Sequence, residues 1–530
     1  MADLGPEGPG SYRLLRGLRS RLVHRFEQAA MNPEAAERDS LARVLDAVRG
    51  TTFDRRHNLQ SVRTIGEWRE AVPVRTWADY ADDLRQVAAG EHDRLVRHPV
   101  LSFVRTSGTT AEPKLLPVTA QWAREVAEAQ EIWTLAMARS DARLATGRLL
   151  VSVGRPDEDR TASGHRIGSN TGRMAAEQPW WARARYAVPA SVAAIPDPTV
   201  RRYVALRIAL AHDVRFWTTA NPTTLLANCR ALEEHAEALR IDVADGTLAH
   251  GPASDLPART RAALWPHLRR RRLPEDLRPA SVWDLAAVAC WKGGAVAGFL
   301  PRLPKALGRD LPVWEPGISA SEGFFAVALD ATWTGGVAWL LGHLLEFVPV
   351  EGGAPVGAAE VEVGRTYRLI ISTTAGLYRY DLDDLVRVVG WWRRAPQLVF
   401  VGKGSDVSSI TGEKLTAEQV GLAAARALGA RPVAGFSLAL RVGDVPHYTF
   451  VVEGDVDDGA AARVDEALST VNVEYAGKRA DGRLGPVDLL RVPAGAYGRL
   501  RDHHLRSGAA EGQVKDPVFP SDATLARLTG

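Results

Sequence analysis

The sequence contains few of the residues that form covalent cross-links or metal sites. Its 530 residues include only two cysteines, Cys229 and Cys290. Two thiols cannot make a disulfide framework or a cysteine-rich metal site, so we expect a cytoplasmic protein in a reducing compartment. The 13 histidines form no H-E-x-x-H pattern and no cluster with the cysteines, so they indicate no metal site.

Long apolar runs are missing as well. The most apolar stretch, residues 337–350, is too short to span a bilayer and contains His343 and Glu346. Residues 11–26 alternate leucine and arginine at helical spacing, which favours an amphipathic first helix over an arginine-rich transit peptide. The net charge of +3 is small for this length. We therefore expect neither nucleic acid nor a membrane as a partner.

Lysine is much rarer than arginine. Of the 66 lysines and arginines, seven are lysines. They are Lys114, Lys292, Lys305, Lys403, Lys414, Lys478 and Lys515. A lysine carries a compact ammonium group that can contact a single oxygen, whereas arginine presents a planar fork. Lys414, before a predicted helix, and Lys515, in a polar loop near the C-terminus, are therefore candidates for a role that arginine cannot perform.

The chain is long enough for more than one domain. Residues 1–50 are predicted to be helical. Residues 100–110 form an apolar strand that runs into a glycine-containing loop, and a helix follows. From about residue 361 the pattern is typical of strands, and after residues 403–406 the order becomes helix, strand, strand, helix. We expect a hinge at 403–406 between a domain over 1–402 and a smaller α+β domain over 407–530.

Residues 104–119 read VRTSGTTAEPKLLPVT. The loop contains Thr106, Ser107, Gly108, Thr109 and Thr110. Hydroxyls and a flexible backbone after a strand can donate hydrogen bonds to a phosphate chain, and Lys114 adds a positive charge. The segment is no Walker A loop, because GxxxxGK[ST] is absent, and Ser107 lacks the G-x-S-x-G context of a serine hydrolase. By itself the segment is equally compatible with a polar surface turn.

Two acidic segments are candidates for contacts with a cation or a ribose. Glu322 lies among small residues in PGISASEGFF, where a carboxylate could hold Mg²⁺ on phosphate oxygens. Asp381, Asp383 and Asp384 lie in GLYRYDLDDLVRV, where a carboxylate at a strand end can accept both hydroxyls of a ribose. The alternatives are a glutamate at a helix start and a solvated turn, respectively, and the residues alone leave them open.

Seven segments in this order resemble the auxin-responsive-promoter family of acyl-acid amido synthetases. They are TSGTTAEPKLLPVT, CWKGG, GISASEG, LLEFVPVE, VGRTYRLIISTTAGLYRYDLDDLVRV, GEKLTAEQV, and GRLGPVDLLRV with GQVKDP. The resemblance implies an α/β fold, with a large N-terminal adenylate-forming domain of β-sheets and helices and a small mobile α+β C-terminal domain. It also implies ATP-dependent adenylation of a carboxylic acid. An amine, commonly that of an amino acid, then takes the acyl group, which gives an amide, AMP and pyrophosphate.

The resemblance also assigns site residues by position. Residues 106–110 and Lys114 would bind the phosphates of ATP, Asp384 would bind the ribose hydroxyls, and Glu322 would hold Mg²⁺ and take part in catalysis. Lys414 and Lys515 would meet the phosphate and the reacting carboxylate as catalytic residues. The nucleotide site would also include Ser321, Tyr378, Arg387 and Lys403. The implied cofactors are ATP and Mg²⁺, the implied partners are a carboxylic acid and an amine, and the implied state is a monomer.

Four positions depart from the family pattern. Ala111 replaces a glycine of the phosphate loop, Ile318 replaces an aromatic residue expected against adenine, and Val514 replaces an aromatic residue before the last lysine. Asp383 replaces the glycine that precedes the ribose aspartate, which leaves Asp383 as a rival to Asp384. Two other functions stay open: a ligase that transfers the acyl group to a coenzyme A or carrier-protein thiol, and a non-catalytic nucleotide-binding relative.

Overall fold

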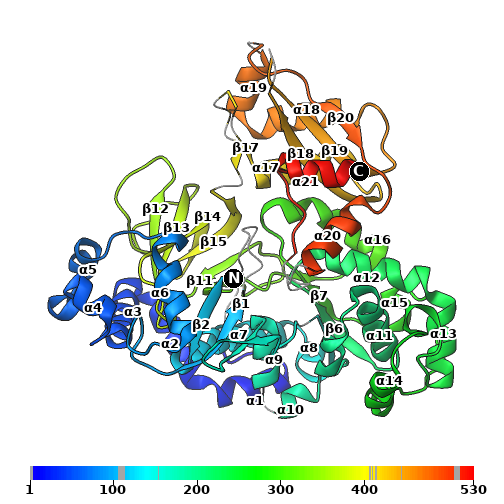
Figure 1. Cartoon of the computed structure of the whole chain (residues 1–530), viewed down its shortest axis with the longest axis horizontal. Helices are drawn as coiled ribbons and strands as arrows, with labels where there is room; N and C mark the ends of the chain where they lie inside the picture. The colour runs from blue at the N-terminus through cyan, green and yellow to red at the C-terminus, as the bar shows by residue number, and fades with distance from the viewer. Residues whose placement is uncertain are drawn as a thin grey trace.

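The computed structural model describes residues 4–105, 114–152, 154–178, 180–404, 407–408, 410–411, 413, 415–442, 445–480, 482–506 and 514–530. Figure 1 shows a large body that contains the N-terminal helices and most of the strands, with the C-terminal part stacked on one side of it. In the described part of the chain, no helix has the length and apolar character needed to cross a membrane.

The N-terminal segment is helical, as the sequence predicts. Its elements are α1 (Gly10–Leu18), α2 (Ser20–Met31), α3 (Pro33–Val48), α4 (Thr52–His57), η1 (Leu59–Ser61), α5 (Ile65–Ala71) and α6 (Trp77–Ala89). Thr64 begins α5 in a capping box with Glu67, and Thr76 begins α6 in the same way with Asp79. Gly90, with a φ of 109°, ends α6 in a left-handed conformation that favours glycine.

Two four-stranded sheets follow. The first has the order β2-β1-β5-β4, and the second, which is parallel, has the order β3-β6-β7-β8. Their strands are β1 (Val100–Arg105), β2 (Leu115–Thr119), β3 (Arg148–Val151), β4 (Asp159–Arg160), β5 (Arg166–Gly168), β6 (Val214–Thr218), β7 (Ala287–Ala289) and β8 (Val313–Trp314). Strand β1 ends at Arg105, directly before the predicted phosphate loop, whose residues 106–113 lie outside the described part.

Helices pack around these sheets, and the longest follows β2 directly. They are α7 (Ala120–Ser140), α8 (Ala142–Thr146), α9 (Asn170–Glu177), α10 (Trp180–Arg183), η2 (Ala190–Ala194), α11 (Pro198–Leu210), α12 (Pro222–Glu234), α13 (Ala236–Asp245), η3 (Gly251–Ala253), α14 (Ala258–Leu264), η4 (Trp265–His267), α15 (Pro279–Val282), η5 (Gly294–Arg302) and α16 (Leu303–Leu307). The predicted strand-to-helix sequence around residues 100–140 is thereby confirmed.

A third sheet has seven strands in the order β12-β13-β14-β15-β11-β10-β9, and its adjacent pairs are antiparallel. They are β9 (Ile318–Ala320), β10 (Gly323–Val327), β11 (Gly336–Ala338), β12 (Leu344–Pro349), β13 (Thr366–Ser372), β14 (Tyr380–Trp392) and β15 (Ala395–Lys403). The largest core cluster packs residues of these strands against α2, α3, α5, α6 and α7. The predicted change to strands after residue 361 is confirmed.

The C-terminal part has its own sheet and core. It comprises β16 (Val407–Ser408), β17 (Leu415–Thr416), α17 (Ala417–Leu428), β18 (Val433–Arg441), β19 (His447–Gly454), α18 (Ala460–Val471), α19 (Val473–Ala480), β20 (Asp488–Arg491), α20 (Ala496–Arg506) and α21 (Asp522–Thr529). The predicted order helix, strand, strand, helix is confirmed by α17, β18, β19 and α18. Strand β20 adds a parallel neighbour to β19.

The small C-terminal part is docked on the large one through η5 and α17. Phe299 of η5 stacks on Phe436 of β18, with ring centroids 5.2 Å apart, and belongs to the same core cluster as the small sheet. Arg302 donates a hydrogen bond to the carbonyl oxygen of Val433 at 2.5 Å. The predicted hinge at 403–406 begins at Lys403, the last residue of β15. Because residues 405–406 lie outside the described part, the hinge and the two domain bounds stay predictions.

Candidate active site

Five charged side chains from four segments of the chain act on one another near the start of β14 and the end of β15. We call Lys114, Glu322, Asp383, Asp384 and Lys403 the carboxylate–lysine cluster. Lys403 forms an ion pair with Asp384 and donates to the carbonyl oxygen of Leu382 at 3.0 Å. The charges of Glu322 and Asp383 act on both Lys403 and Lys114. The structure thus brings together four of the predicted site residues (Lys114, Glu322, Asp384, Lys403) and the rival Asp383.

The aspartates owe their positions to an irregularity in β14. The pairing of β13 with β14 shifts between Arg368 and Ile370, and Asp383 has a left-handed φ of 59°. Such a bulge redirects the side chains that follow it. Asp384 then pairs in register with Lys403 and is 5% exposed. The aspartates therefore lie in a strand, and the alternative of a solvated turn is wrong.

Asp383 and Gly404 are in close contact. The backbone N–H of Gly404 donates to the carbonyl oxygen of Asp383 at 2.7 Å. A Cβ atom on Gly404 would lie 2.3 Å from the Asp383 carboxylate, so only glycine fits there without a shift. Asp383 therefore lies against Gly404, whereas the Asp384 carboxylate is buried against Lys403.

Glu322 lies in the turn between β9 and β10. The indole N–H of Trp122 donates to the carbonyl oxygen of Glu322 at 2.9 Å. The neighbouring Gly323 packs on the buried ring of His343, since a Cβ atom at 323 would lie 2.1 Å from His343 Nε2. The turn is held from two sides, with the buried Ser321 beside it. The alternative that Glu322 begins a helix is wrong.

Burial and neighbouring charges shift the pKa values of the cluster. Burial raises the pKa of Glu322 above its usual value, and the charges of Lys403 and Lys114 only partly oppose this. Burial lowers the pKa of Lys114, although the Glu322 carboxylate acts in the opposite direction. Burial also acts to lower the pKa of Lys403, but the charge and hydrogen bond of Asp384 outweigh it, and the pKa is raised. A further cation near Glu322 would therefore stabilise its ionised form.

Lys515 reaches the large part of the molecule from the small one. Its ammonium nitrogen lies 4.8 Å from the ring centroid of Trp291 and 5.2 Å from that of Phe400. Phe400 belongs to β15, the strand that ends at Lys403. The preceding carbonyl, that of Val514, accepts a hydrogen bond from the side chain of Asn221 at 3.3 Å. Lys515 is therefore placed where the two parts of the molecule meet.

Two predicted nucleotide residues do not join the cluster. Tyr378 is fully buried, and its hydroxyl donates to the carbonyl oxygen of Leu95 at 2.6 Å. Burial raises the pKa of Tyr378 well above its usual value. Arg387 forms two hydrogen bonds, 2.8 and 3.0 Å long, with Glu418 of α17, and so links β14 to the small part. Lys414 and Thr106, Ser107, Gly108, Thr109 and Thr110 lie outside the described residues.

The structure adds aromatic neighbours that the sequence did not single out. The ammonium group of Lys114 donates to the hydroxyl oxygen of Tyr380 at 3.3 Å and lies 5.0 Å from the ring centroid of Trp77. Tyr380 and Trp77 come from distant segments, so no local pattern points to them. Ile318, at the position where an aromatic residue was expected, is buried on β9.

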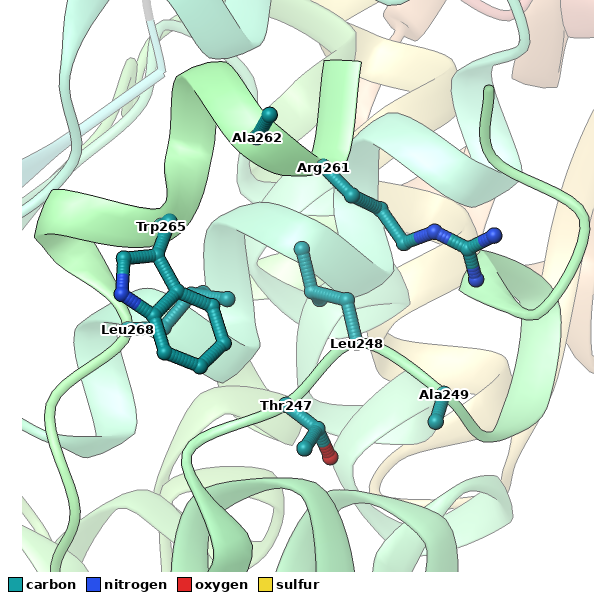
Figure 2. Close-up of a pocket in the computed structure, with 7 residues that line it drawn as sticks. All are labelled: Thr247, Leu248, Ala249, Arg261, Ala262, Trp265 and Leu268. Atoms are coloured by element: carbon teal, nitrogen blue, oxygen red, sulfur yellow. The ribbon is translucent and has the colours of Figure 1, made fainter. Parts of the chain in front are cut away.

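A separate hollow of about 580 Å³ lies in the helical region after β6. Figure 2 shows Trp265, Leu268 and Leu248 around it, with the guanidinium group of Arg261 at one side. None of the cluster residues lines it. Among the described residues, no group of three or more histidine, cysteine, aspartate or glutamate side chains could hold a metal ion.

Comparison with solved structures defines the class of fold. The structure superimposes on an acyl acid amido synthetase, AtGH3.15 in complex with 2,4-DB, with a TM-score of 0.84 and 20% sequence identity, over 96% of this chain and 95% of that one. The fold is therefore that of an acyl acid amido synthetase.

Three family models match the chain in sequence order. The GH3 family N-terminal domain matches residues 22–313, the central domain 337–403 and the C-terminal domain 417–523. The chain belongs to the GH3 family. It is 24% identical to the indole-3-acetic acid-amido synthetase GH3.4 of Arabidopsis thaliana, over 95% of this chain and 92% of the relative. It is also 24% identical to the jasmonoyl–L-amino acid synthetase GH3.5 of Oryza sativa subsp. japonica, over 96% of each.

Proposed function

We propose that this GH3 protein is an ATP-dependent acyl-acid amido synthetase: it adenylates a carboxylic acid and transfers the acyl group to an amine, such as that of an amino acid. The observation that carries the proposal is the carboxylate–lysine cluster, in which two lysines and three carboxylates from separate segments meet inside a GH3 fold. A carboxylate can hold Mg²⁺ on the phosphate oxygens of a nucleotide, and lysine ammonium groups can stabilise the charge of those phosphates.

In the first half-reaction a carboxylate oxygen of the acid attacks the α-phosphorus of ATP, and pyrophosphate leaves with the electrons of the broken P–O bond. Attack brings two anions together, so positive groups aimed at the developing charge lower the barrier. We assign this role to Lys515 and Lys414, and phosphate contacts to Lys114 and residues 106–110. Alignment of the acid with ATP contributes much of the remaining acceleration.

In the second half-reaction the amine nitrogen attacks the carbonyl carbon of the acyl-adenylate. The C–O bond to AMP breaks, the amine loses a proton, and amide and AMP leave. Asp384 holds the ribose hydroxyls through its carboxylate while Lys403 balances its charge. Ser321, beside Glu322 in the β9–β10 turn, contributes to the nucleotide site. The roles of Tyr378 and Arg387 in that site require a change from the contacts described above.

A magnesium ion fits the donors at this site. Mg²⁺ takes oxygen ligands and is commonly held by one or two carboxylates together with phosphate oxygens. Glu322 offers such a carboxylate, and its raised pKa shows that its ionised form lacks full compensation from Lys403 and Lys114. The ion would supply charge neutralisation on the phosphate oxygens. We propose a monomer in the cytoplasm without nucleic acid or membrane partners.

The decisive experiment is exchange of labelled pyrophosphate into ATP with Mg²⁺ and a panel of carboxylic acids. We expect exchange with at least one acid, and then an amide product when amino acids are added. A thioester formed with coenzyme A or a carrier protein, and no amide with any amine, would favour the thiol-transferring alternative. A folded protein that neither exchanges pyrophosphate nor binds ATP in a calorimetric titration would be the non-catalytic relative.

A further inference from the structure

The ammonium group of Lys515 lies near two aromatic rings, which come from segments far apart in the sequence of the large body. Its ammonium nitrogen lies 4.8 Å from the Trp291 centroid and 5.2 Å from the Phe400 centroid. A cation within about 6 Å of a ring centroid is attracted by the negative face of the ring. We propose that Trp291 and Phe400 are positioning residues that hold the Lys515 ammonium group for adenylation; this rests on the function proposed above.

The loop that carries Trp291 is shaped to approach Phe400. A Cβ atom on Gly293 would lie 2.7 Å from the carbonyl oxygen of Phe400. Gly294 has a φ of 66°, and a Cβ atom there would lie 3.2 Å from the Phe400 ring. Side chains at either position would push the loop away from β15. The two glycines of CWKGG therefore allow the loop to approach β15, so that the rings of Trp291 and Phe400 both lie near the ammonium group of Lys515.

Polar contacts of Lys292 also hold this loop in place. Glu315 is 3% exposed and accepts a hydrogen bond from the backbone N–H of Lys292 at 2.8 Å. The ammonium group of Lys292 donates to the carbonyl oxygens of Ala331 at 2.8 Å and Trp333 at 2.7 Å. A loop anchored at its backbone and at its side chain can keep Trp291 in one place.

An aromatic site suits a lysine that must act on anions. An aromatic ring attracts an ammonium group without adding a negative charge of its own. Lys114 has a similar neighbour, since its ammonium nitrogen lies 5.0 Å from the Trp77 centroid.

The first test is a double-mutant cycle in the pyrophosphate exchange assay. Trp291→Leu should lower kcat about tenfold and leave the KM for ATP within about twofold, since the ring acts on Lys515 and not on the nucleotide. Trp291→Phe should recover most of the rate. On a Lys515→Ala background, Trp291→Leu should cause no further loss. Equal losses on both backgrounds would overturn the proposal, as would a wild-type rate in Trp291→Leu.

The second test does not depend on activity. Lys515 in the whole protein is labelled with a small amine-reactive acylating reagent, and the modified peptide is measured by mass spectrometry. Labelling should be several-fold faster in Trp291→Leu and Phe400→Leu than in wild type. The control is Trp391→Leu, at a tryptophan on β14 that is 40% exposed, and it should label at the wild-type rate.

The two tests separate the failure of this inference from that of the proposed function. If wild type exchanges pyrophosphate with no acid, the proposed function fails, and the labelling rates still decide whether the rings hold Lys515. Unchanged labelling in both Trp291→Leu and Phe400→Leu would refute the aromatic site even in an active enzyme. If Trp291→Leu strongly lowers the melting temperature, the labelling and exchange rates of Trp291→Phe and Phe400→Leu are compared with those of wild type in its place.

Discussion

The choice between Asp383 and Asp384 as the ribose-binding residue can be tested with a matched pair of variants. We predict that Asp384→Asn raises the ATP concentration needed for half-maximal pyrophosphate exchange about tenfold or more. Asp383→Gly should leave this concentration within about twofold of wild type. The reason is geometric: the Asp384 carboxylate is buried and forms an ion pair with Lys403, whereas the Asp383 carboxylate lies against Gly404.

The size of the first effect follows from the lost charge. A hydrogen bond to a charged group contributes about 1.5–3 kcal/mol, which corresponds to about tenfold to hundredfold in affinity. Asparagine keeps one acceptor oxygen but no charge. Lys403 loses its ion-pair partner in this variant, but its side chain is 38% exposed, so water replaces much of that interaction. We therefore expect a small change in stability and a large one in ATP affinity.

The second effect depends on the backbone of Asp383. Its φ of 59° lies in the left-handed region, which disfavours most residues with a Cβ atom by about 1–2 kcal/mol, with aspartate at the low end. Glycine adopts this conformation readily, so Asp383→Gly should keep the bulge and the position of Asp384. Asp383→Val should instead strain the bulge and lower both stability and ATP affinity.

The assay is calorimetric titration with ATP and Mg²⁺ beside exchange kinetics, with melting temperatures as the control for folding. An Asp383→Gly variant that loses ATP affinity while Asp384→Asn keeps it would move the ribose contact to Asp383. Equal losses in both variants, at wild-type melting temperatures, would mean that both carboxylates bind the nucleotide, and the single-residue assignment would be wrong.

Lys515→Ala should lower the exchange rate about a hundredfold or more and leave the dissociation constant of ATP nearly unchanged; if both change together in a titration, the lysine is a binding residue. Phe299→Ala should weaken docking of the small part, because its ring stacks on Phe436 and buried phenylalanine-to-alanine changes cost about 3–5 kcal/mol. We expect faster proteolysis near residues 403–406 than in the exposed control Val442→Ala, and equal rates would contradict the role of this stack. Glu125 of α7 is buried, and burial raises its pKa from 4.5 to about 7. Between about pH 4.5 and about pH 7 the folded state keeps a proton that the unfolded state loses. The free energy of unfolding therefore falls as the pH rises from about 4.5 to about 7, by at most about 3 kcal/mol for this group, and does not change further above about pH 7. Glu125→Gln should flatten this pH dependence relative to wild type in urea denaturation, and identical slopes would rule out the shift.

Local patterns predicted the elements and several of the site residues. The strand before residue 106, the helix after residue 119 and the helix, strand, strand, helix order after residue 407 follow from hydrophobic periodicity and capping residues within short windows. Four residues predicted from short motifs, Lys114, Glu322, Asp384 and Lys403, belong to the carboxylate–lysine cluster.

Contacts across the sheet were less predictable. Side chains of a strand alternate between the two faces of the sheet, but the sequence GLYRYDLDD does not show which face lies in the core. A bulge also changes which residues point to each face within the segment. Tyr378 was predicted at the nucleotide but is buried against Leu95, whereas Tyr380, two residues later, meets Lys114. Arg387, also predicted at the nucleotide, pairs with Glu418 across the docked parts, and its role at the nucleotide stays a prediction.

The sequence by itself therefore determined the family and the order of the elements, and it supplied candidate residues for phosphate, ribose and cation binding, since these depend on residue type and local spacing. Only the tertiary structure decided which of them meet. Lys515, Trp291 and Phe400 lie far apart in the chain, and they come together because β15, the CWKGG loop and the small part are packed in one arrangement. Packing of this kind depends on strand register and on how the two parts dock, and neither is encoded in any single segment.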